Sequence, residues 1–294
     1  MKILLLGKNG QVGWELQRAL APLGHVVALD RSHMNGLCGD LANLPELEKT
    51  ILAVKPDVIV NAAAYTAVDK AETEQEQAFL INAGAPALLA KLCKIINARL
   101  VHYSTDYVFD GKGQAPLSEN QPVAPVNVYG TTKAAGEQAI QDSGCQYLIF
   151  RTSWVYASKG SNFAKTMLRL AGERSSLDVI ADQIGAPTGA DLIADITVQT
   201  IVSEVGESDK SGIYHLAASG ETSWYEYTRY VIDVAREMGR ELQVSQINPI
   251  PSSEYPTPAQ RPLNSRLNCD KLRSTFGLNL PHWKLGIKRM LQEI

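Results

Sequence analysis

The chain is poor in the residues that build disulfide frameworks and metal sites. Its four cysteines, Cys38, Cys93, Cys145 and Cys269, lie far apart and form no CxxC pair. This spacing indicates small buried thiols in a reducing compartment and argues against a disulfide framework or a zinc site. The five histidines are equally scattered. Metal ligation through histidine is therefore not expected.

A basic excess and long apolar runs are also missing. The 294 residues carry a net charge of −3, whereas a nucleic-acid-binding protein would be basic. The apolar run after Lys2 ends at Gly7, which is too short for a signal peptide. No apolar run approaches the roughly 20 residues of a membrane span. We therefore expect a cytoplasmic protein that binds neither nucleic acid nor a membrane.

Short apolar runs alternate with helical patterns through the first half of the chain. The runs predict strands over residues 2–6, 25–30, 57–64, 99–106 and 146–156. The helices predicted between them cover residues 11–24, 41–55, 71–81, 83–98 and 131–142. Continuous apolar strands separated by helices predict an α/β fold with a Rossmann-type, doubly wound parallel sheet that is covered on both faces.

The alternation of short apolar runs and helical patterns becomes less regular after residue 155, and prolines become frequent in the C-terminal half. We expect a dinucleotide-binding domain over residues 1–155, with later elements around 177–200 and 213–220 returning to it. Residues 156–294 would then form mainly a smaller C-terminal α/β substrate-binding domain.

A glycine-rich turn follows the first strand. GKNGQVG places Gly7, Gly10 and Gly13 between this strand and the first helix. Such glycines allow a tight turn and close approach of the backbone to a pyrophosphate, while the helix N-terminus supplies free N–H groups. The pattern favours a dinucleotide site, and three ordinary turn glycines are the alternative.

The end of the second strand bears on the choice of cofactor. Asp30, 23 residues after Gly7, can accept hydrogen bonds from the adenosine ribose, which favours NADH. Arg31 follows directly and can pair with a 2′-phosphate, which favours NADPH. The sequence leaves this choice open, and a plain turn role for Asp30 is the alternative. Asp40 falls where a loop would contact adenine.

Two further strand ends carry small or polar side chains. After the third strand, Ala62, Ala63 and Ala64 would let a cofactor lie against the backbone, although alanines packed against a helix would look the same. After the fourth strand, the hydroxyl of Ser104 or Thr105 can bind a substrate carbonyl or the alkoxide formed from it. A turn stabilised by the hydroxyl is the alternative.

Tyr129 and Lys133 form the chain's one pair in which Lys follows Tyr after four positions. About 0.6 such pairs are expected by chance, so the spacing alone is weak support. The two residues share a helix face, where the ammonium would lower the pKa of the phenol towards that of a working general acid. Because all these features converge on one sheet edge, we interpret the pair as catalytic and not as surface residues.

Longer motifs identify a family. GKNGQVG, STDYVFDG, NVYGTTKAAGE, FRTSWVYASKGSNFAKTML, GAPTGADLIAD and YPTPAQRPLNSRLN resemble the dTDP-4-dehydrorhamnose reductases, extended short-chain dehydrogenases/reductases, over essentially the whole chain. The resemblance implies reduction of the 4-keto group of dTDP-4-dehydro-β-L-rhamnose (dTDP-4-dehydro-L-rhamnose) by NADPH or NADH. This is the last step towards the activated rhamnose of O-antigen and other cell-surface polysaccharides.

The resemblance also implies roles for single residues. Tyr129 would be the general acid, with Thr105 and Lys133 beside it. Cofactor contacts are implied for the glycine turn with Gln11 and Val12, for Asp30, Asp40 and Leu41, and for Ala64, Tyr65, Thr66 and Tyr103. Contacts to the sugar nucleotide are implied for Asp106, Tyr107 and Trp154. Arg261 and Arg266, in the Pro-rich segment, are candidates for the substrate diphosphate, with plain surface positions as the alternative.

Some enterobacterial relatives dimerise around Mg2+ held by carboxylates, and Glu15, Asp191 and Glu293 fall at the matching positions. Carboxylates suit a hard cation, although Asp191 is one methylene shorter than the Glu of the pattern. A Mg2+-bridged homodimer and three solvated surface acids are both open. Two other functions occur on this fold: a sugar-nucleotide epimerase or dehydratase, and a non-catalytic regulatory subunit of methionine adenosyltransferase.

Overall fold

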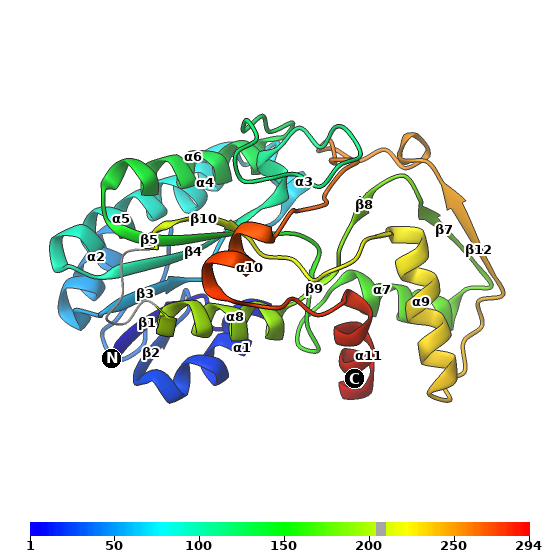
Figure 1. Ribbon diagram of the computed structural model, residues 1–294, viewed down its shortest axis with the longest axis horizontal. Coiled ribbons are helices and arrows are strands. Elements are labelled where there is room, and N and C mark those ends of the chain that lie inside the picture. Colours follow the sequence, from blue (N-terminus) through cyan, green and yellow to red (C-terminus); the bar gives the residue numbers. More distant parts are fainter. Residues whose placement is uncertain (204–209) are drawn as a thin grey trace.

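A six-stranded parallel sheet forms the centre of the computed structural model, which describes residues 1–203 and 210–294 (Figure 1). In spatial order its strands are β10 (Gly212–His215), β5 (Gln146–Thr152), β4 (Arg99–Thr105), β3 (Val58–Asn61), β1 (Lys2–Leu6) and β2 (His25–Leu29). All neighbouring pairs are parallel, as predicted. The strand order reverses between β1 and β3, so ligands are expected at the carboxyl ends of these two strands.

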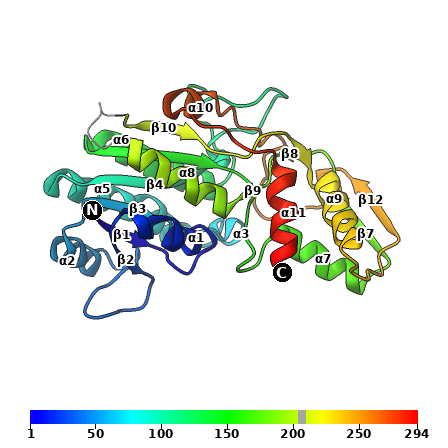
Figure 2. The ribbon, with the colours of Figure 1, turned by 60° about the horizontal axis from the view of Figure 1, so that its bottom comes forward.

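Helices cover both faces of the sheet (Figures 1 and 2). One face packs against α1 (Gln11–Leu20), α8 (Ala190–Ser203) and α10 (Asp270–Phe276), and the other against α2 (Leu44–Val54), α5 (Ala85–Ile96) and α6 (Val128–Ser143). Alternate side chains of β1 divide between the two cores, because successive residues of a strand point to opposite faces. Ile3 and Leu5 lie in the first core, whereas Leu4 and Leu6 lie in the second. The doubly wound fold is therefore confirmed.

Two predicted strands are shorter than expected. The third strand ends at Asn61, so the alanines that follow belong to a loop. The fifth ends at Thr152, because Trp154 has a left-handed backbone conformation (φ 49°) that a strand does not tolerate. The chain then forms β6 (Val155–Tyr156), which leaves the sheet and pairs with β9 (Thr188–Gly189).

Helix α6 begins three residues earlier than predicted. Asn127 caps it, since its side-chain oxygen accepts the backbone N–H of Gly130 at 2.8 Å. Tyr129 therefore lies in the first helical turn and not before it. Gly130 is needed there, because a Cβ on this residue would lie 2.1 Å from the carbonyl oxygen of Tyr107.

The helix predicted over residues 71–81 forms as short pieces. These are α3 (Val68–Ala71), α4 (Gln75–Phe79) and a π-helical turn, η2 (Leu80–Gly84), which continues into α5. In this turn, buried Asn82 bonds to the backbone of Tyr65 and donates to the hydroxyl of Thr132 in α6. The turn thereby joins the loop after β3 to the helix that carries Tyr129.

One helical stretch, Gln75–Ile96, is long and apolar enough to cross a membrane, with 22 residues and a mean hydropathy of 1.5. Length and composition are the only grounds for that statement. In the structure the stretch lies in the helical layer over the sheet, where Leu89 and Cys93 belong to the core. This packing accounts for its apolar side.

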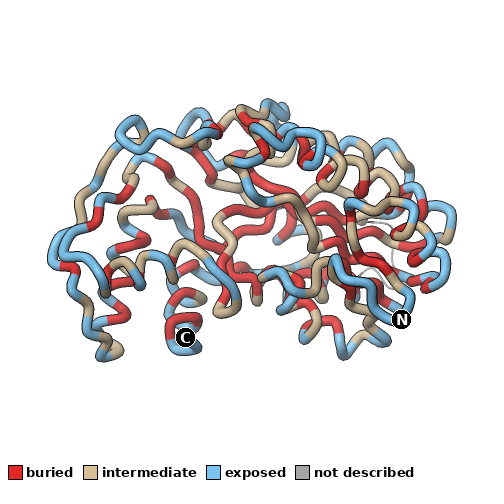
Figure 3. The backbone as a smooth tube through the Cα atoms, turned by 180° about the vertical axis from the view of Figure 1, so that it is seen from behind, coloured by how far each residue is buried: buried red, intermediate tan, exposed pale blue. Residues whose placement is uncertain are grey.

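A smaller lobe lies beside the sheet, on the right in Figure 1. It contains the parallel pair β7 (Ser176–Ile180) and β12 (Gln246–Ile250), the short pair β8 (Ile184–Gly185) and β11 (Thr222–Ser223), and helices α7 (Phe163–Glu173), α9 (Trp224–Glu237) and α11 (Trp283–Glu293). Figure 3 shows buried segments gathered in the sheet and where the two lobes meet. A domain boundary at residue 155 stays a prediction, and α8 and β10 lie in the sheet lobe.

Candidate active site

The glycine turn after β1 packs closely on the loop after β3. The N–H of Gly7 donates to the carbonyl of Leu29 at 2.9 Å. A Cβ on Gly7 would lie 2.8 Å from the amide nitrogen of Ala63, and one on Gly13 would lie 2.0 Å from the carbonyl oxygen of Gly7. Both positions must therefore be glycine. Gly10 differs, because the space around its Cβ position is open apart from Gly7.

This turn fits the pyrophosphate of a dinucleotide. Gly10 is the N-cap of α1, and no side chain caps the free N–H groups there. The side-chain oxygen of Gln11 is buried and has no hydrogen-bond partner among the described residues, so it can accept from a hydroxyl of the cofactor but not bind its phosphates. Helix N-termini favour anionic groups, and the small side chains after β3 leave the backbone accessible. These residues would hold the cofactor at the predicted place.

The adenosine end of the site has mixed charge. The Asp30 carboxylate accepts from Asn9 at 2.5 Å and from the N–H of Ser32 at 2.8 Å, and Lys8 lies 3.7 Å away. The backbone N–H of Ser32 is the main cause that lowers the pKa of Asp30. The loop of Asp40 packs directly against the backbone of Asp30, since a Cβ on Gly39 would lie 2.6 Å from the backbone oxygen of Asp30.

Tyr129 lies beside the end of β4. Its ring meets that of Tyr107 edge to face, with 5.6 Å between centroids. Thr105 accepts the N–H of Tyr107 at 3.1 Å, and its hydroxyl donates to Asp106 at 3.1 Å. The structure thus brings together four of the predicted catalytic and substrate residues, although their roles stay predictions.

The structure shifts the pKa of Tyr129 in the direction opposite to the predicted one. Burial is the main cause that raises the pKa, the Asp106 charge adds to it, and the hydrogen bond to Thr105 opposes it. Burial also raises the pKa of Asp106 to about 6. The lowering predicted from Lys133 is absent because the amino group of Lys133 is directed elsewhere: its Nζ donates to the carbonyl of Tyr103 at 2.6 Å.

Trp154 is held at the border of the smaller lobe. Its ring stacks on Trp224 with 3.5 Å between centroids and 14° between planes. The indole also packs on Gly185, where a Cβ would lie 2.8 Å from it. Trp224 was not predicted as a site residue, and the aromatic cluster SWYEY is the sequence signal that points to it.

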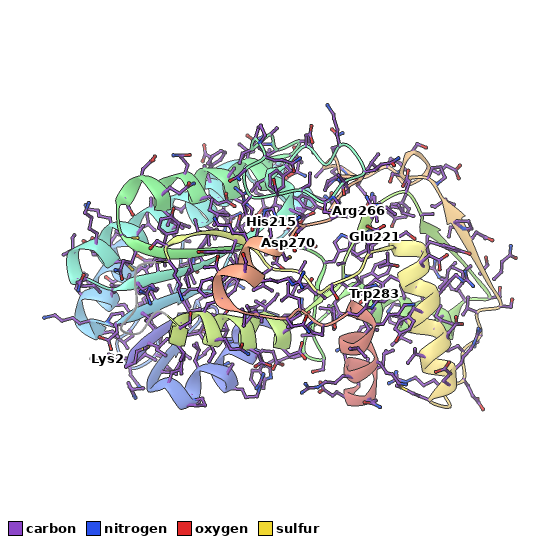
Figure 4. The ribbon with its side chains drawn as sticks, in the orientation of Figure 1. Lys2, His215, Glu221, Arg266, Asp270 and Trp283 are labelled. Atoms are coloured by element: carbon purple, nitrogen blue, oxygen red, sulfur yellow. The ribbon has the colours of Figure 1, made fainter. Side chains whose placement is uncertain are left out.

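The two arginines predicted for the diphosphate already have carboxylate partners. Arg261 pairs with Asp69 at 2.7 Å, and Arg266 pairs with Glu221 at 2.7 Å where the two lobes meet (Figure 4). Nη1 of Arg261 is buried and has no partner in residues 1–203 and 210–294. Arg261 therefore keeps one donor for an anion.

The three predicted metal ligands line one small hollow, where each lies close to an arginine. Arg289 lies 3.9 Å from Asp191 and 3.2 Å from Glu293, while Glu15 pairs with Arg18 at 3.5 Å. In the described ranges, no group of three His, Cys, Asp or Glu side chains is arranged to hold a metal. These guanidinium groups partly neutralise the carboxylates, which counts against a Mg2+ site, and the metal site stays a prediction.

A neighbouring hollow of about 230 Å³ is lined by Tyr156, Asp191, His282, Trp283 and other residues. Neither hollow contains a predicted catalytic residue, so both are separate from the edge that carries Tyr129.

A doubly wound sheet with a glycine turn at its switch point, and with half-buried Tyr129 and buried Lys133 on one helix beside it, is typical of a nicotinamide-dependent oxidoreductase of the short-chain dehydrogenase/reductase type. The family model of the RmlD substrate binding domain matches residues 1–294. The dTDP-4-dehydrorhamnose reductase of Escherichia coli (strain K12) is 55% identical over 294 residues, which cover 100% of this chain and 98% of that protein. The chain belongs to the dTDP-4-dehydrorhamnose reductase family, as its motifs predicted.

Solved structures agree with this assignment. A dTDP-4-dehydrorhamnose reductase from Clostridium acetobutylicum superposes with a TM-score of 0.90 at 34% identity, covering 99% of both chains. The enzyme of that name from Bacillus anthracis, in complex with NADP, has a TM-score of 0.88 at 33% identity, covering 100% of this chain and 99% of that one.

Proposed function

We propose that this protein reduces the 4-keto group of dTDP-4-dehydro-β-L-rhamnose to dTDP-β-L-rhamnose, the final step of dTDP-L-rhamnose synthesis. The observation that carries the proposal is the match to this family over residues 1–294. The protein would act in the cytoplasm, and its product would supply O-antigen and other surface polysaccharides.

In this proposal each site residue has a separate role. When bound, NADPH or NADH supplies the hydride. The turn from Gly7 to Gly13 holds the pyrophosphate, and its open middle glycine lets the phosphate approach. Tyr129 donates a proton to the carbonyl oxygen. Tyr129 carries its proton at neutral pH, since the ordinary pKa of a tyrosine is near 10 and burial raises the pKa of Tyr129 further. The Thr105 hydroxyl is held beside it and binds the same oxygen.

The substrate would lie between the two lobes. Asp106, Tyr107 and Trp154 contact the sugar, and the stack on Trp224 fixes the indole face. Arg261 offers its unpartnered Nη1 to the diphosphate. The Pro-rich segment that carries Arg261 is tied to the catalytic helix, because Asn127 donates to the carbonyl of Gln260 at 2.8 Å.

The test is the variant Tyr129→Phe. It removes the proton donor and keeps the ring, so kcat should fall about 10²-fold or more while cofactor affinity stays unchanged. NADH and NADPH oxidation with dTDP-4-dehydrorhamnose measures both the activity and the cofactor preference. Tyr230→Phe is the matched control: it removes a phenol hydroxyl that bonds to Lys284 outside the site.

Unchanged turnover in Tyr129→Phe would contradict the mechanism. An inactive wild-type protein would contradict the function itself. A protein that is purified with tightly bound NAD and consumes no added cofactor would instead be an epimerase or a dehydratase of the same fold.

The Mg2+-bridged homodimer stays a prediction from the resemblance. Glu15, Asp191 and Glu293 share one hollow, which supports it, but their pairing with Arg18 and Arg289 argues against it. Sedimentation of the protein with and without EDTA tests whether a metal ion holds a homodimer together. A dimer that dissociates on chelation would support the metal bridge, and an unchanged mass would exclude it.

A further inference from the structure

Gln183, in the smaller lobe, faces the indole of Trp224. The antiparallel pair of β8 and β11 places Ser223 opposite Ile184. Continuing this register by one residue places Trp224 opposite Gln183, and facing side chains of an antiparallel pair interact. Nε1 of Trp224 donates to Oε1 of Gln183 at 3.1 Å. Gln183 is only 7% exposed, so its amide is directed by the protein and not by solvent.

A chain of donors fixes the orientation of this amide. An indole N–H can only donate, so the amide oxygen of Gln183 must face Trp224. The amide nitrogen donates to Oγ of Ser252 at 3.0 Å, and this hydroxyl donates to Oδ1 of Asp182 at 2.6 Å. The backbone N–H of Ser252 also donates to the Asp182 carboxylate, at 2.9 Å. Turning the amide over would place its nitrogen against the indole N–H, donor against donor.

The amide in turn fixes the ring of Trp224. Ser223 is the N-cap of α9 and accepts the backbone N–H of Glu226 at 3.0 Å, which holds the backbone at the first helical residue. The bond to Gln183 then sets the rotation of the ring, because only one edge of an indole carries an N–H. In this orientation the ring lies on Trp154, with 3.5 Å between centroids and 14° between planes.

Trp154 depends on such support. Its backbone is left-handed (φ 49°), a conformation that residues other than glycine rarely adopt and that surrounding contacts must hold. Residues 183–185 supply two of these contacts: Gln183 acts through Trp224, and the indole packs directly on Gly185. The alternative is a plain packing role for Trp224, whose ring also lies 4.3 Å from that of Phe163.

We propose that Gln183 is a positioning residue for the keto sugar of the substrate: it orients the ring of Trp224, which holds the indole of Trp154 against that sugar. This role rests on the proposed function, in which Trp154 contacts the sugar. Gln183 touches neither substrate nor cofactor in this role. Its amide should therefore affect binding of the sugar and leave binding of the cofactor unchanged.

Circular dichroism tests the orientation of Trp224 without any activity. Two indoles stacked this closely couple and give paired bands of opposite sign, which are assigned by their loss in Trp154→Phe and in Trp224→Phe. Gln183→Met has a similar length and no acceptor for the indole N–H, so the bands should weaken about twofold or more. Unchanged bands in this variant would overturn the proposal. Gln246→Met, which removes a surface amide bonded to Asn248 in the same lobe, should leave them unchanged.

Calorimetry separates positioning of the sugar from a merely structural role. Gln183→Met should bind dTDP-β-L-rhamnose about tenfold more weakly, which corresponds to the loss of one hydrogen bond. It should bind dTDP, which lacks this sugar, within about twofold of wild type. Ser252→Ala removes the acceptor of the amide nitrogen and is the milder variant, with an expected loss of about threefold for dTDP-β-L-rhamnose. Equal losses for dTDP and dTDP-β-L-rhamnose would overturn the proposal.

Steady-state kinetics should show the same division. In Gln183→Met, KM for dTDP-4-dehydrorhamnose should rise about tenfold, while kcat and KM for the cofactor stay within about twofold. A fall in kcat with an unchanged KM for the sugar nucleotide would contradict the role in positioning. A wild-type protein that neither binds dTDP-β-L-rhamnose nor oxidises NADPH would count against the proposed function, whereas circular dichroism would still show whether Gln183 orients Trp224.

Discussion

Replacing Gly130 by alanine should inactivate the enzyme without touching a reacting group. The new Cβ would lie 2.1 Å from the carbonyl oxygen of Tyr107, whereas ordinary contact begins near 3.4 Å. Helix α6 and Tyr107, two residues after β4, must therefore separate by about 1.3 Å, the difference between these distances. Tyr129 and Thr105 sit on the two sides of this contact, and a misplacement of about 1 Å costs roughly 10²-fold in rate.

The assay is NADPH oxidation with dTDP-4-dehydrorhamnose, combined with thermal unfolding. Gly130→Ala should lower kcat about 10²-fold and destabilise the fold by about 1–3 kcal/mol. Gly172→Ala is the matched control. Its Cβ would meet no atom within 4 Å, so kcat should stay unchanged and stability should rise by about 0.5–1 kcal/mol. A kcat within twofold of wild type for Gly130→Ala would refute the steric argument.

Two further predictions concern buried charge. Arg151 and Glu137 pair at 2.6 Å with side chains 2% exposed, so Arg151→Met should cost about 3–5 kcal/mol in urea unfolding by leaving a carboxylate buried alone. Adding Glu137→Leu should recover most of that loss, and no recovery would contradict this account. Burial lowers the pKa of His215 to about 3 from a usual value of 6.5, so the unfolded chain takes up this proton first as the pH falls. Stability should be full above pH 6.5 and decline towards pH 3 by up to about 1.4 kcal/mol per pH unit. His215→Phe should lose less stability between pH 7 and 5, and an unchanged slope would refute this cause.

The parts of the fold that depend on local patterns were predictable from the sequence. KILLL followed by GKNGQVG predicted β1, its turn and α1, because apolar runs and glycine spacing act within a few residues. The end of β5 was not predictable. Trp154 adopts a left-handed conformation that side chains rarely take, and its contacts with Trp224 and Gly185 come from distant segments. Local propensity carries no signal of such contacts.

The same limit applies to the site. The Tyr129–Lys133 spacing placed both residues on one helix, but it did not show where the amine points. That direction is set by His102 and Tyr103 on a neighbouring strand. The observation that counts against the predicted metal site was hidden for a similar reason, because Arg289 comes near Asp191 only in the folded chain. The sequence motifs predicted which residues share a helix or a sheet edge. Contacts between distant segments determine where the amine of Lys133 points and which carboxylates pair with arginines.

The position of β10 restricts how this enzyme can be recombined. The chain leaves the sheet lobe after β5, returns to it to form α8 and β10, and leaves it again for α9 (Figure 2). A cut at residue 155 would remove an edge strand from the sheet and expose the face of α1 that packs on α8. The smaller lobe therefore cannot be exchanged between proteins as one continuous segment of the chain. New sugar preferences in such a chain would have to come from replacements in its loops and not from shuffling of whole domains.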